Sequence, residues 1–177
     1  MTDRGTTKRD TGSSTGSPVD AGLVVREATR ADLAAVLALV AADAIREVAE
    51  HVAGDGSLAR GYVAAYEEIT ADPNALLLVG VLDGEVVATC QVNFLRHLMY
   101  HGGLVGQVES VRTAAGLRGQ GIGTALMEWV LAECRRRGAI RLQLTSNAAR
   151  TDAHRFYERL GFVASHVGMK RYLGADE

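Results

Sequence analysis

A glycine-rich hexapeptide, Arg118 to Gly123, has the residue types and spacing in this sequence best suited to binding a ligand. It reads Arg-Gly-Gln-Gly-Ile-Gly, and the run from Thr124 to Arg137 that follows it has the apolar spacing of a helix. A turn that leads from a strand into a helix collects backbone N–H groups, and the helix dipole there favours an anion. The segment therefore predicts a phosphate-binding loop.

Two common phosphate loops do not fit this segment. A Walker loop needs a lysine directly after its last glycine, whereas Gly123 is followed by Thr124 and Ala125. A dinucleotide fingerprint needs Gly-x-Gly-x-x-Gly, and its third glycine is out of register from either Gly119 or Gly121. The pattern Arg-x-x-Gly-x-Gly does fit, because glycines without Cβ atoms let a pyrophosphate approach the backbone. A glycine-rich turn that binds nothing is the alternative.

The hexapeptide resembles the coenzyme A loop of the GNAT superfamily of N-acetyltransferases, whose pattern is Gln/Arg-x-x-Gly-x-Gly/Ala. Residues 153–162 are similar to the late helix-to-strand signature of the same superfamily. The resemblance implies an acyltransferase that moves the acetyl group of acetyl-CoA, its cosubstrate, to a primary amine. It also implies that the coenzyme contacts one strand and the loop after it, through Val111, Arg112, Thr113, Arg118, Gly119, Gln120, Gly121, Ile122, Gly123 and Thr124.

The resemblance implies two residues for acid–base catalysis. Tyr157 matches the tyrosine near the thioester sulfur, where it would protonate the departing thiolate, and packing beside Phe156 and Phe162 is the alternative. An amine with a pKa of about 10.4 is mostly protonated at neutral pH, so a base is needed as well. Glu109 occupies a position similar to a glutamate that some members use, although strand alternation could equally make it an exposed charge.

The region before Tyr157 departs from the family pattern. Many relatives carry an asparagine seven residues before the tyrosine, where this chain has Arg150, and Asn147 lies three residues earlier. Asn147 is assigned to the coenzyme, with Arg150 as the alternative. The segment from Leu144 to Tyr157 is most similar to the aminoalkylphosphonate acetyltransferase branch and its small-amine relatives.

This similarity favours a small primary amine as acceptor, including one that carries a phosphonate or carboxylate. Four basic residues are expected to flank the acceptor entrance, namely Arg96, His97, His101 and Arg150. The alternatives are a protein lysine or N-terminal acetyltransferase and a non-catalytic domain that senses coenzyme A. A peptide groove near the first two helices would draw on acidic residues there, namely Asp43, Glu47, Glu50, Glu67 and Glu68.

The elements that would position these groups follow the order β-αα-βββ-α-β-α-β, an α/β arrangement. Strands are expected at 23–27, 75–82, 85–96, 105–113, 140–145 and 162–172. Helices are expected after the capping box Thr29-x-x-Asp32, from Ser57 to Pro73, and at 124–137 and 151–160. Asp83-Gly84 suits a type I′ hairpin. The order resembles the GNAT fold, a mixed central sheet with helices on both faces.

Composition sets the domain organisation and excludes several classes. Residues 1–22 are nearly all Thr, Ser, Gly and charged, which predicts a disordered tail, and 23–177 are expected to form one N-acetyltransferase domain. A formal net charge of -2 argues against nucleic-acid binding. The apolar stretch from Leu33 to Ala42 is about half of the roughly 20 residues that a membrane span needs.

The cysteines and histidines give no pattern of a metal site or disulfide. Cys90 and Cys134 form no CxxC pair, so they are expected to pack as free thiols in a reducing cytoplasm. His97, His101 and His154 match no ligand spacing. The sequence sets no oligomeric state, and a homodimer is compatible with the resemblance.

Overall fold

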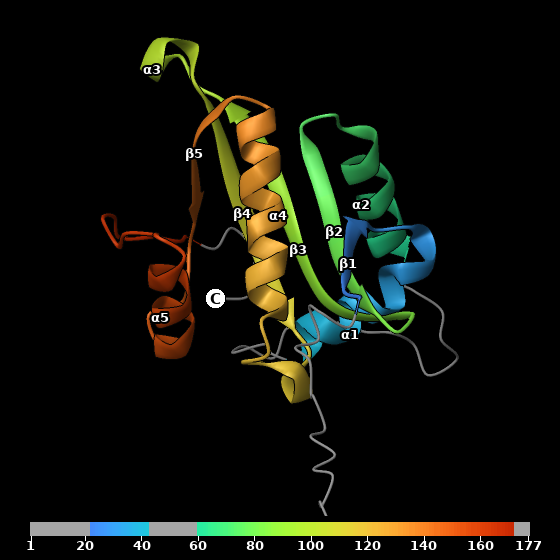
Figure 1. Cartoon of the computed structure of the whole chain (residues 1–177). Coiled ribbons are helices and arrows are strands. Elements are labelled where there is room, and N and C mark those ends of the chain that lie inside the picture. Colours follow the sequence, from blue (N-terminus) through green and yellow to red (C-terminus); the bar gives the residue numbers. More distant parts are fainter. Residues whose placement is uncertain (1–21, 43–59, 172–177) are drawn as a thin grey trace, which may run out of the picture.

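The computed structural model describes residues 22–42 and 60–171, and its centre is a five-stranded sheet in the order β1-β2-β3-β4-β5 (Figure 1). The strands are β1 (Val24–Glu27), β2 (Ala75–Leu82), β3 (Glu85–Arg96), β4 (Leu104–Thr113) and β5 (Ala139–Leu144). Neighbouring strands are antiparallel except β4 and β5, which are parallel. A parallel pair needs a crossover connection, and a helix between β4 and β5 supplies it.

The helices are α1 (Leu33–Ala41), α2 (Arg60–Ala71), α3 (Met99–Gly102), α4 (Ile122–Arg136) and α5 (Thr151–Arg159). Leu78 of β2 packs in the core that α4 covers, whereas the next residue, Val79, packs with Val36 of α1. Successive strand residues point to opposite faces, so α4 and α1 cover opposite faces of the sheet. The mixed sheet with helices on both faces confirms the expected GNAT-like α/β fold. No helix in the described ranges is long and apolar enough to cross a membrane.

Helix α4 supplies most of the main core. Its buried residues are Ile122, Leu126, Met127, Val130 and Cys134, spaced as one face of a helix. Leu126 and Met127 have no exposed surface and pack with fully buried residues of the central strands. This packing fixes the N-terminus of α4 against the sheet, at the end of the glycine-rich loop.

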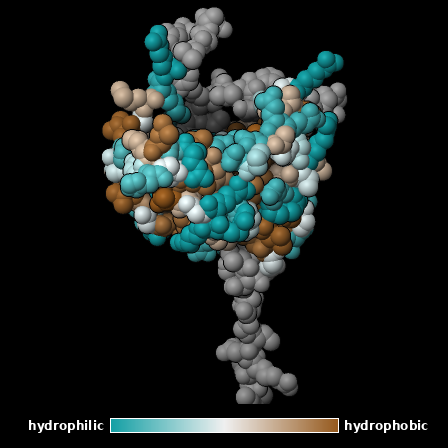
Figure 2. All heavy atoms as spheres, turned by 90° about the horizontal axis from the view of Figure 1, so that it is seen from above, coloured by the Kyte–Doolittle hydropathy of each residue, from teal (hydrophilic) through white to brown (hydrophobic). Residues whose placement is uncertain are grey.

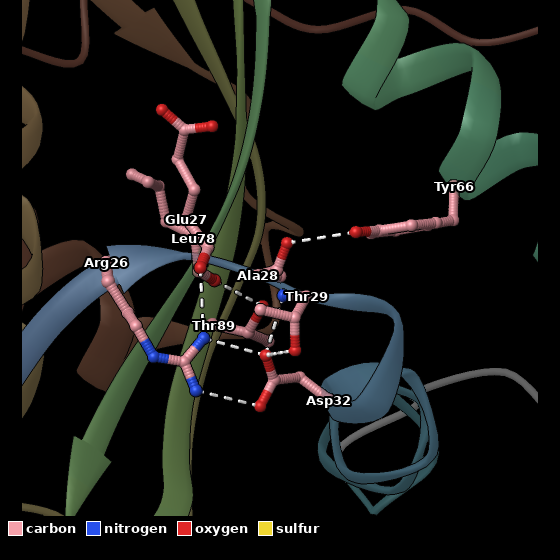
Figure 3. Close-up of polar contacts among 8 residues, drawn as sticks. All are labelled: Arg26, Glu27, Ala28, Thr29, Asp32, Tyr66, Leu78 and Thr89. Atoms are coloured by element: carbon pink, nitrogen blue, oxygen red, sulfur yellow. Dashed lines mark hydrogen bonds and ion pairs between the residues drawn. The ribbon is translucent and has the colours of Figure 1, made fainter.

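A capping arrangement joins β1 to the start of the α1 segment (Figure 3). The carboxylate of Asp32 accepts hydrogen bonds from the Arg26 guanidinium at 2.7 and 3.0 Å, and from the backbone N–H and the hydroxyl of Thr29 at 2.7 Å each. Tyr66 of α2 donates to the carbonyl of Ala28 at 3.2 Å. The expected capping box is therefore formed, with an arginine added to it.

The turn between β2 and β3 contains residues that suit its backbone conformation, whereas the turn between β3 and β4 contains a residue that does not. Asp83 and Gly84 both have positive φ, 52° and 83°, as the predicted type I′ turn requires. In α3, Tyr100 and His101 also have positive φ, 57° and 54°, a conformation that is uncommon for residues other than glycine and especially for a bulky residue such as Tyr100. Arg141 of β5 stabilises this tip, since its Nη1 donates to the Tyr100 hydroxyl at 3.0 Å. Figure 2 views this end of the molecule and shows hydrophobic side chains at the surface among hydrophilic ones.

One predicted strand is absent from the described residues. Over 162–171 the backbone forms no ladder, and the Ser165 N–H instead donates to the Val163 carbonyl at 2.9 Å. Val163, Val167 and Met169 are 81%, 88% and 93% exposed. Alternating apolar residues form a strand only where a neighbouring edge and a core accept them, and here only Phe162, the first residue of the segment, packs on the core. The predicted tail, the turn at 54–56 and the cap at Ser57 lie outside the described residues.

Candidate active site

Strand β4 contains a bulge at the residue that follows Glu109. Thr89 of β3 pairs with Arg112, and Gln91 pairs with Glu109, so β4 has one more residue than β3 between these two pairs. Ser110 lies in this stretch with a φ of 53°, in the left-handed region. A bulge of this kind re-aims the side chains on either side of it.

Strand β4 also separates from β5 at this point. The last pair between the two strands joins Val108 to Leu144, so the ladder between β4 and β5 ends before residues 109–113. Two arginines bind carbonyl groups of this segment: Arg112 Nη1 donates to Val111 at 2.9 Å, and Arg118 Nε, from the loop that follows, donates to Thr113 at 3.3 Å. An unpaired strand edge can bind an extended ligand as if it were an added strand.

The glycine-rich loop connects this edge to α4. Gly119 and Gly121 have φ of 77° and 87°, which only glycine adopts without cost, and Gly121 is the N-cap of α4. Gly123 lies where α4 meets β4 and α5, since a Cβ there would be in van der Waals contact with Phe156 Cζ at 3.4 Å and with Thr113 Oγ1 at 3.5 Å. The loop therefore presents backbone N–H groups beside the open edge of β4.

Tyr157 of α5 lies at the same opening. Its ring packs against Phe156 and Phe162, with centroids 5.1 and 5.7 Å away. Burial raises the pKa of Tyr157, while the positive charges of Arg150 and Arg112 act in the opposite direction. The hydroxyl therefore stays protonated through neutral pH, the state in which it can donate a proton.

Glu109 is exposed and close enough to Tyr157 for its charge to raise the tyrosine pKa as well. Its Oε1 accepts a hydrogen bond from Gln107 Nε2 at 2.8 Å, and Gln107 in turn accepts one from Gln143 Nε2 at 2.9 Å. Neither glutamine was predicted from the sequence. The signal for them is a polar residue at alternate positions of otherwise apolar strands, as at Gln107 and Glu109 of β4.

Asn147 and Arg150 occupy different surroundings. The Asn147 Oδ1 accepts from the backbone N–H of Ala149 at 2.9 Å, so the side chain caps its own turn before α5. Arg150 is the N-cap residue of α5, and its positive charge opposes the rise in the pKa of Tyr157 that burial causes. His154 contacts the Asn147 carbonyl at 3.0 Å. Arg150 is thus the residue of the two that acts on the Tyr157 site.

Three of the four basic residues expected at the acceptor entrance lie elsewhere. Arg96 pairs with Leu104, six residues of strand before Ser110, and at about 3.3 Å per residue this is roughly 20 Å from the bulge. His97 and His101 belong to the same tip, and Figure 1 shows α3 and α5 at opposite ends of the sheet. The prediction that these three residues flank the acceptor entrance is therefore wrong, because they lie at the turn between β3 and β4, whereas the bulge lies near the other end of β4.

Both cysteines are buried free thiols, as expected. Burial raises the pKa of Cys90 to about 12 and also raises that of Cys134. A thiol in this state is a poor nucleophile and a poor metal ligand. Within the described ranges, no group of three or more His, Cys, Asp or Glu side chains could hold a metal ion.

The mixed sheet and the glycine-rich turn that leads from β4 into α4 match the α/β acyltransferase fold that the sequence resemblance implied. Residues 43–162 match the Acetyltransferase (GNAT) family. The chain therefore belongs to this family, and the superfamily expected from its two motifs is confirmed.

Three individual proteins are similar to this chain. The aminoalkylphosphonate N-acetyltransferase of Salmonella typhimurium is 35% identical over 102 residues, which are 58% of this chain and 66% of that protein. A solved protein from Bacillus halodurans C-125, described as a transcriptional regulator, is 39% identical with a TM-score of 0.81, over 86% of this chain and all of that one. A predicted acetyltransferase of Clostridium acetobutylicum, solved with acetyl-CoA, shares the fold alone, at 15% identity and a TM-score of 0.65 over 86% and 97% of the chains.

Proposed function

We propose that this protein transfers the acetyl group of acetyl-CoA to a small primary amine. The observation that carries the proposal is the convergence of Tyr157 and Glu109 at the opening between β4 and β5. The two groups come from distant parts of the chain and supply the proton donor and the proton acceptor that the reaction needs. Family membership and the Salmonella relative support the same activity.

The residues present fit coenzyme A. The open edge of β4 at Val111 to Thr113 suits the extended pantetheine arm, and the backbone of Arg118 to Thr124 suits the pyrophosphate. When bound, acetyl-CoA supplies an acyl group on a thioester, whose leaving group is a thiolate. Asn147 has the least support among the residues expected to bind coenzyme A, since its side chain already accepts a hydrogen bond from the backbone of its own turn.

In the proposed reaction Glu109 takes a proton from the acceptor ammonium, directly or through water. The amine nitrogen then forms the new C–N bond as the C–S bond breaks, and the Tyr157 hydroxyl gives its proton to the thiolate. The raised pKa of Tyr157 keeps that proton in place until the thiolate forms. The newly acylated nitrogen then gives its extra proton to the Tyr157 phenolate, and Glu109 releases its proton to bulk water, so both residues return to their starting protonation states.

The acceptor is proposed to be a small amine that carries a phosphonate or carboxylate. The Salmonella relative is an aminoalkylphosphonate N-acetyltransferase. Two guanidinium groups, Arg112 and Arg150, act on the Tyr157 hydroxyl and suit an anion on the acceptor. Of the acidic residues that would favour a peptide, Glu67 already pairs with Arg30 at 3.2 Å, and three others lie outside the described residues. Two buried free thiols suit a reducing compartment, so cytoplasm remains the proposed location.

The test is release of free coenzyme A from acetyl-CoA with three classes of acceptor. These are aminoalkylphosphonates, uncharged alkylamines of similar basicity, and lysine peptides. We expect the highest kcat/KM for the first class. A clear preference for peptide lysine would overturn the acceptor proposal, and binding of acetyl-CoA with no turnover on any class would indicate a sensor domain instead.

A further inference from the structure

A directed chain of hydrogen bonds ends on the proposed base. Gln143 Nε2 donates to Gln107 Oε1 at 2.9 Å, and Gln107 Nε2 donates to Glu109 Oε1 at 2.8 Å. Gln107 and Glu109 are two residues apart on β4, so they share one face of the sheet. Gln107 and Gln143 are partners in the parallel register of β4 and β5. The three side chains therefore form a row across the two strands.

The row lies at the mouth of the opening. The pair formed by Gln107 and Gln143 is followed by only one more pair, Val108 with Leu144, before the strands separate. Glu109 is the first residue beyond the paired region. The two hydrogen bonds thus link the carboxylate of Glu109 to side chains of both strands at the point where the strands diverge.

The hydrogen bond from Gln143 sets the orientation of the Gln107 amide. Because Gln143 donates to the oxygen of Gln107, the amide of Gln107 is turned with its NH2 group toward Glu109. The bond is received by Oε1, which leaves Oε2 to take the proton of the amine. A donor also stabilises the ionised form of a carboxylate, the form that a base needs.

We propose that Gln107 and Gln143 are positioning residues that orient Glu109 and keep it ionised for proton transfer from the acceptor. The inference rests on the proposed function, since it takes Glu109 to be the base. Neither glutamine is required to touch the substrate. The competing explanation is that the two amides only fill the polar face between the strands.

Gln91 provides a matched control for that explanation. It is the partner of Glu109 across β3 and β4 and belongs to the same face, but its Nε2 donates to Asn93 Oδ1 at 3.2 Å. Replacing Gln91 removes a polar amide next to Glu109 without removing the hydrogen bond from Gln107 to the Glu109 carboxylate. Methionine is the substitution of choice at all three glutamines because it keeps the length of the side chain and removes the amide.

The experiment measures kcat/KM against pH for the wild type, Gln107→Met, Gln143→Met and Gln91→Met, with the best small amine from the acceptor screen. We expect the acid limb of the profile to move up by about one pH unit in Gln107→Met, as for a carboxylate that loses one charge-assisted hydrogen bond. The shift in Gln143→Met is expected to be smaller, and Gln91→Met is expected to keep the wild-type limb. The KM for acetyl-CoA should not change in any of them.

Further variants keep the inference testable if Gln107→Met unfolds. Gln107→Glu has the same shape, replaces the donor by a second carboxylate, and should move the acid limb further in the same direction. The inference would be overturned if every glutamine variant kept the acid limb of the wild type. It would also be overturned if Gln107→Met and Gln91→Met moved the acid limb by the same amount. Glu109→Gln separates the two levels: if it retains the wild-type acid limb, the base assignment in the proposed function fails, whatever the glutamine variants show.

Discussion

The carboxylate of Asp32 gives a prediction whose size can be worked out from its contacts (Figure 3). It is 8% exposed and accepts hydrogen bonds from Arg26 and Thr29. Asp32→Ala removes all of these bonds and leaves the Thr29 N–H without its acceptor. Bonds to charged groups contribute about 1.5 to 3 kcal/mol each and are not additive. Since the Arg26 side chain is 39% exposed and regains water, we expect a total loss of about 2 to 3 kcal/mol.

For a chain of this size, about 2 to 3 kcal/mol corresponds to a Tm lower by roughly 5 to 10 °C. Thermal melting followed by circular dichroism measures it. Glu27→Gln is the matched control, because Glu27 is an exposed carboxylate on the same strand as Arg26. That variant should melt within about 2 °C of the wild type, as surface substitutions usually change stability by less than 0.5 kcal/mol.

The effect of Asp32→Ala should also depend on pH. Hydrogen bonds from Arg26, together with those from Thr29, outweigh burial and hold the pKa of Asp32 well below its usual value. A carboxylate with a lowered folded-state pKa stabilises the protein above its unfolded pKa of about 3.9 and loses this contribution as the pH falls through the folded value. The Tm gap between wild type and Asp32→Ala should therefore be full at pH 7 and narrow below about pH 4. A gap of the same size at pH 7 and pH 3 would refute the reasoning.

Three predictions concern the site. Gly121→Val places a branched residue at a φ of 87° and should weaken acetyl-CoA binding about tenfold or more by calorimetry. Gly116→Val, with open space around it in the same segment, should bind as the wild type does. Tyr157→Phe should lower kcat by about 10²- to 10⁴-fold with unchanged acetyl-CoA affinity, and wild-type turnover would return Tyr157 to a packing role. Arg150→Gln should raise the KM for an aminoalkylphosphonate about tenfold and leave the KM for an uncharged amine unchanged. Asn147→Ala is the control and should change neither KM. If Arg150→Gln raises both KM values equally, Arg150 does not bind the anion of the acceptor.

Local sequence signals predicted the fold where the structure depends on local chemistry. Strands β2 and β3 have the predicted bounds because Asp83-Gly84 can form only a tight turn, which sets their register. The helix α4 follows from its apolar spacing and from glycines at either end. The strand expected over 162–172 depended instead on pairing with a distant edge, which no local pattern encodes.

The site shows the same division. The glycine-rich loop and Tyr157 were found because short motifs mark them, and their roles stay predictions. Arg96 and His101 were misplaced because sequence shows that a residue ends a strand but not at which end of the sheet the acceptor enters. The chain from Gln143 to Glu109 was missed because it depends on a parallel register between strands separated by a helix.

The bulge at Ser110 decides which side chains of β4 share the proposed site. With strict alternation, Val111 would lie on the face of Glu109 and Arg112 would point into the core under α4. The extra residue reverses this: Val111 packs against the core that α4 covers, and Arg112 pairs with Thr89 on the other face. The guanidinium of Arg112 then acts on Tyr157 together with the carboxylate of Glu109. A single left-handed residue thus places a proposed base and a positive charge on one face, immediately beyond the last paired residues of β4 and β5.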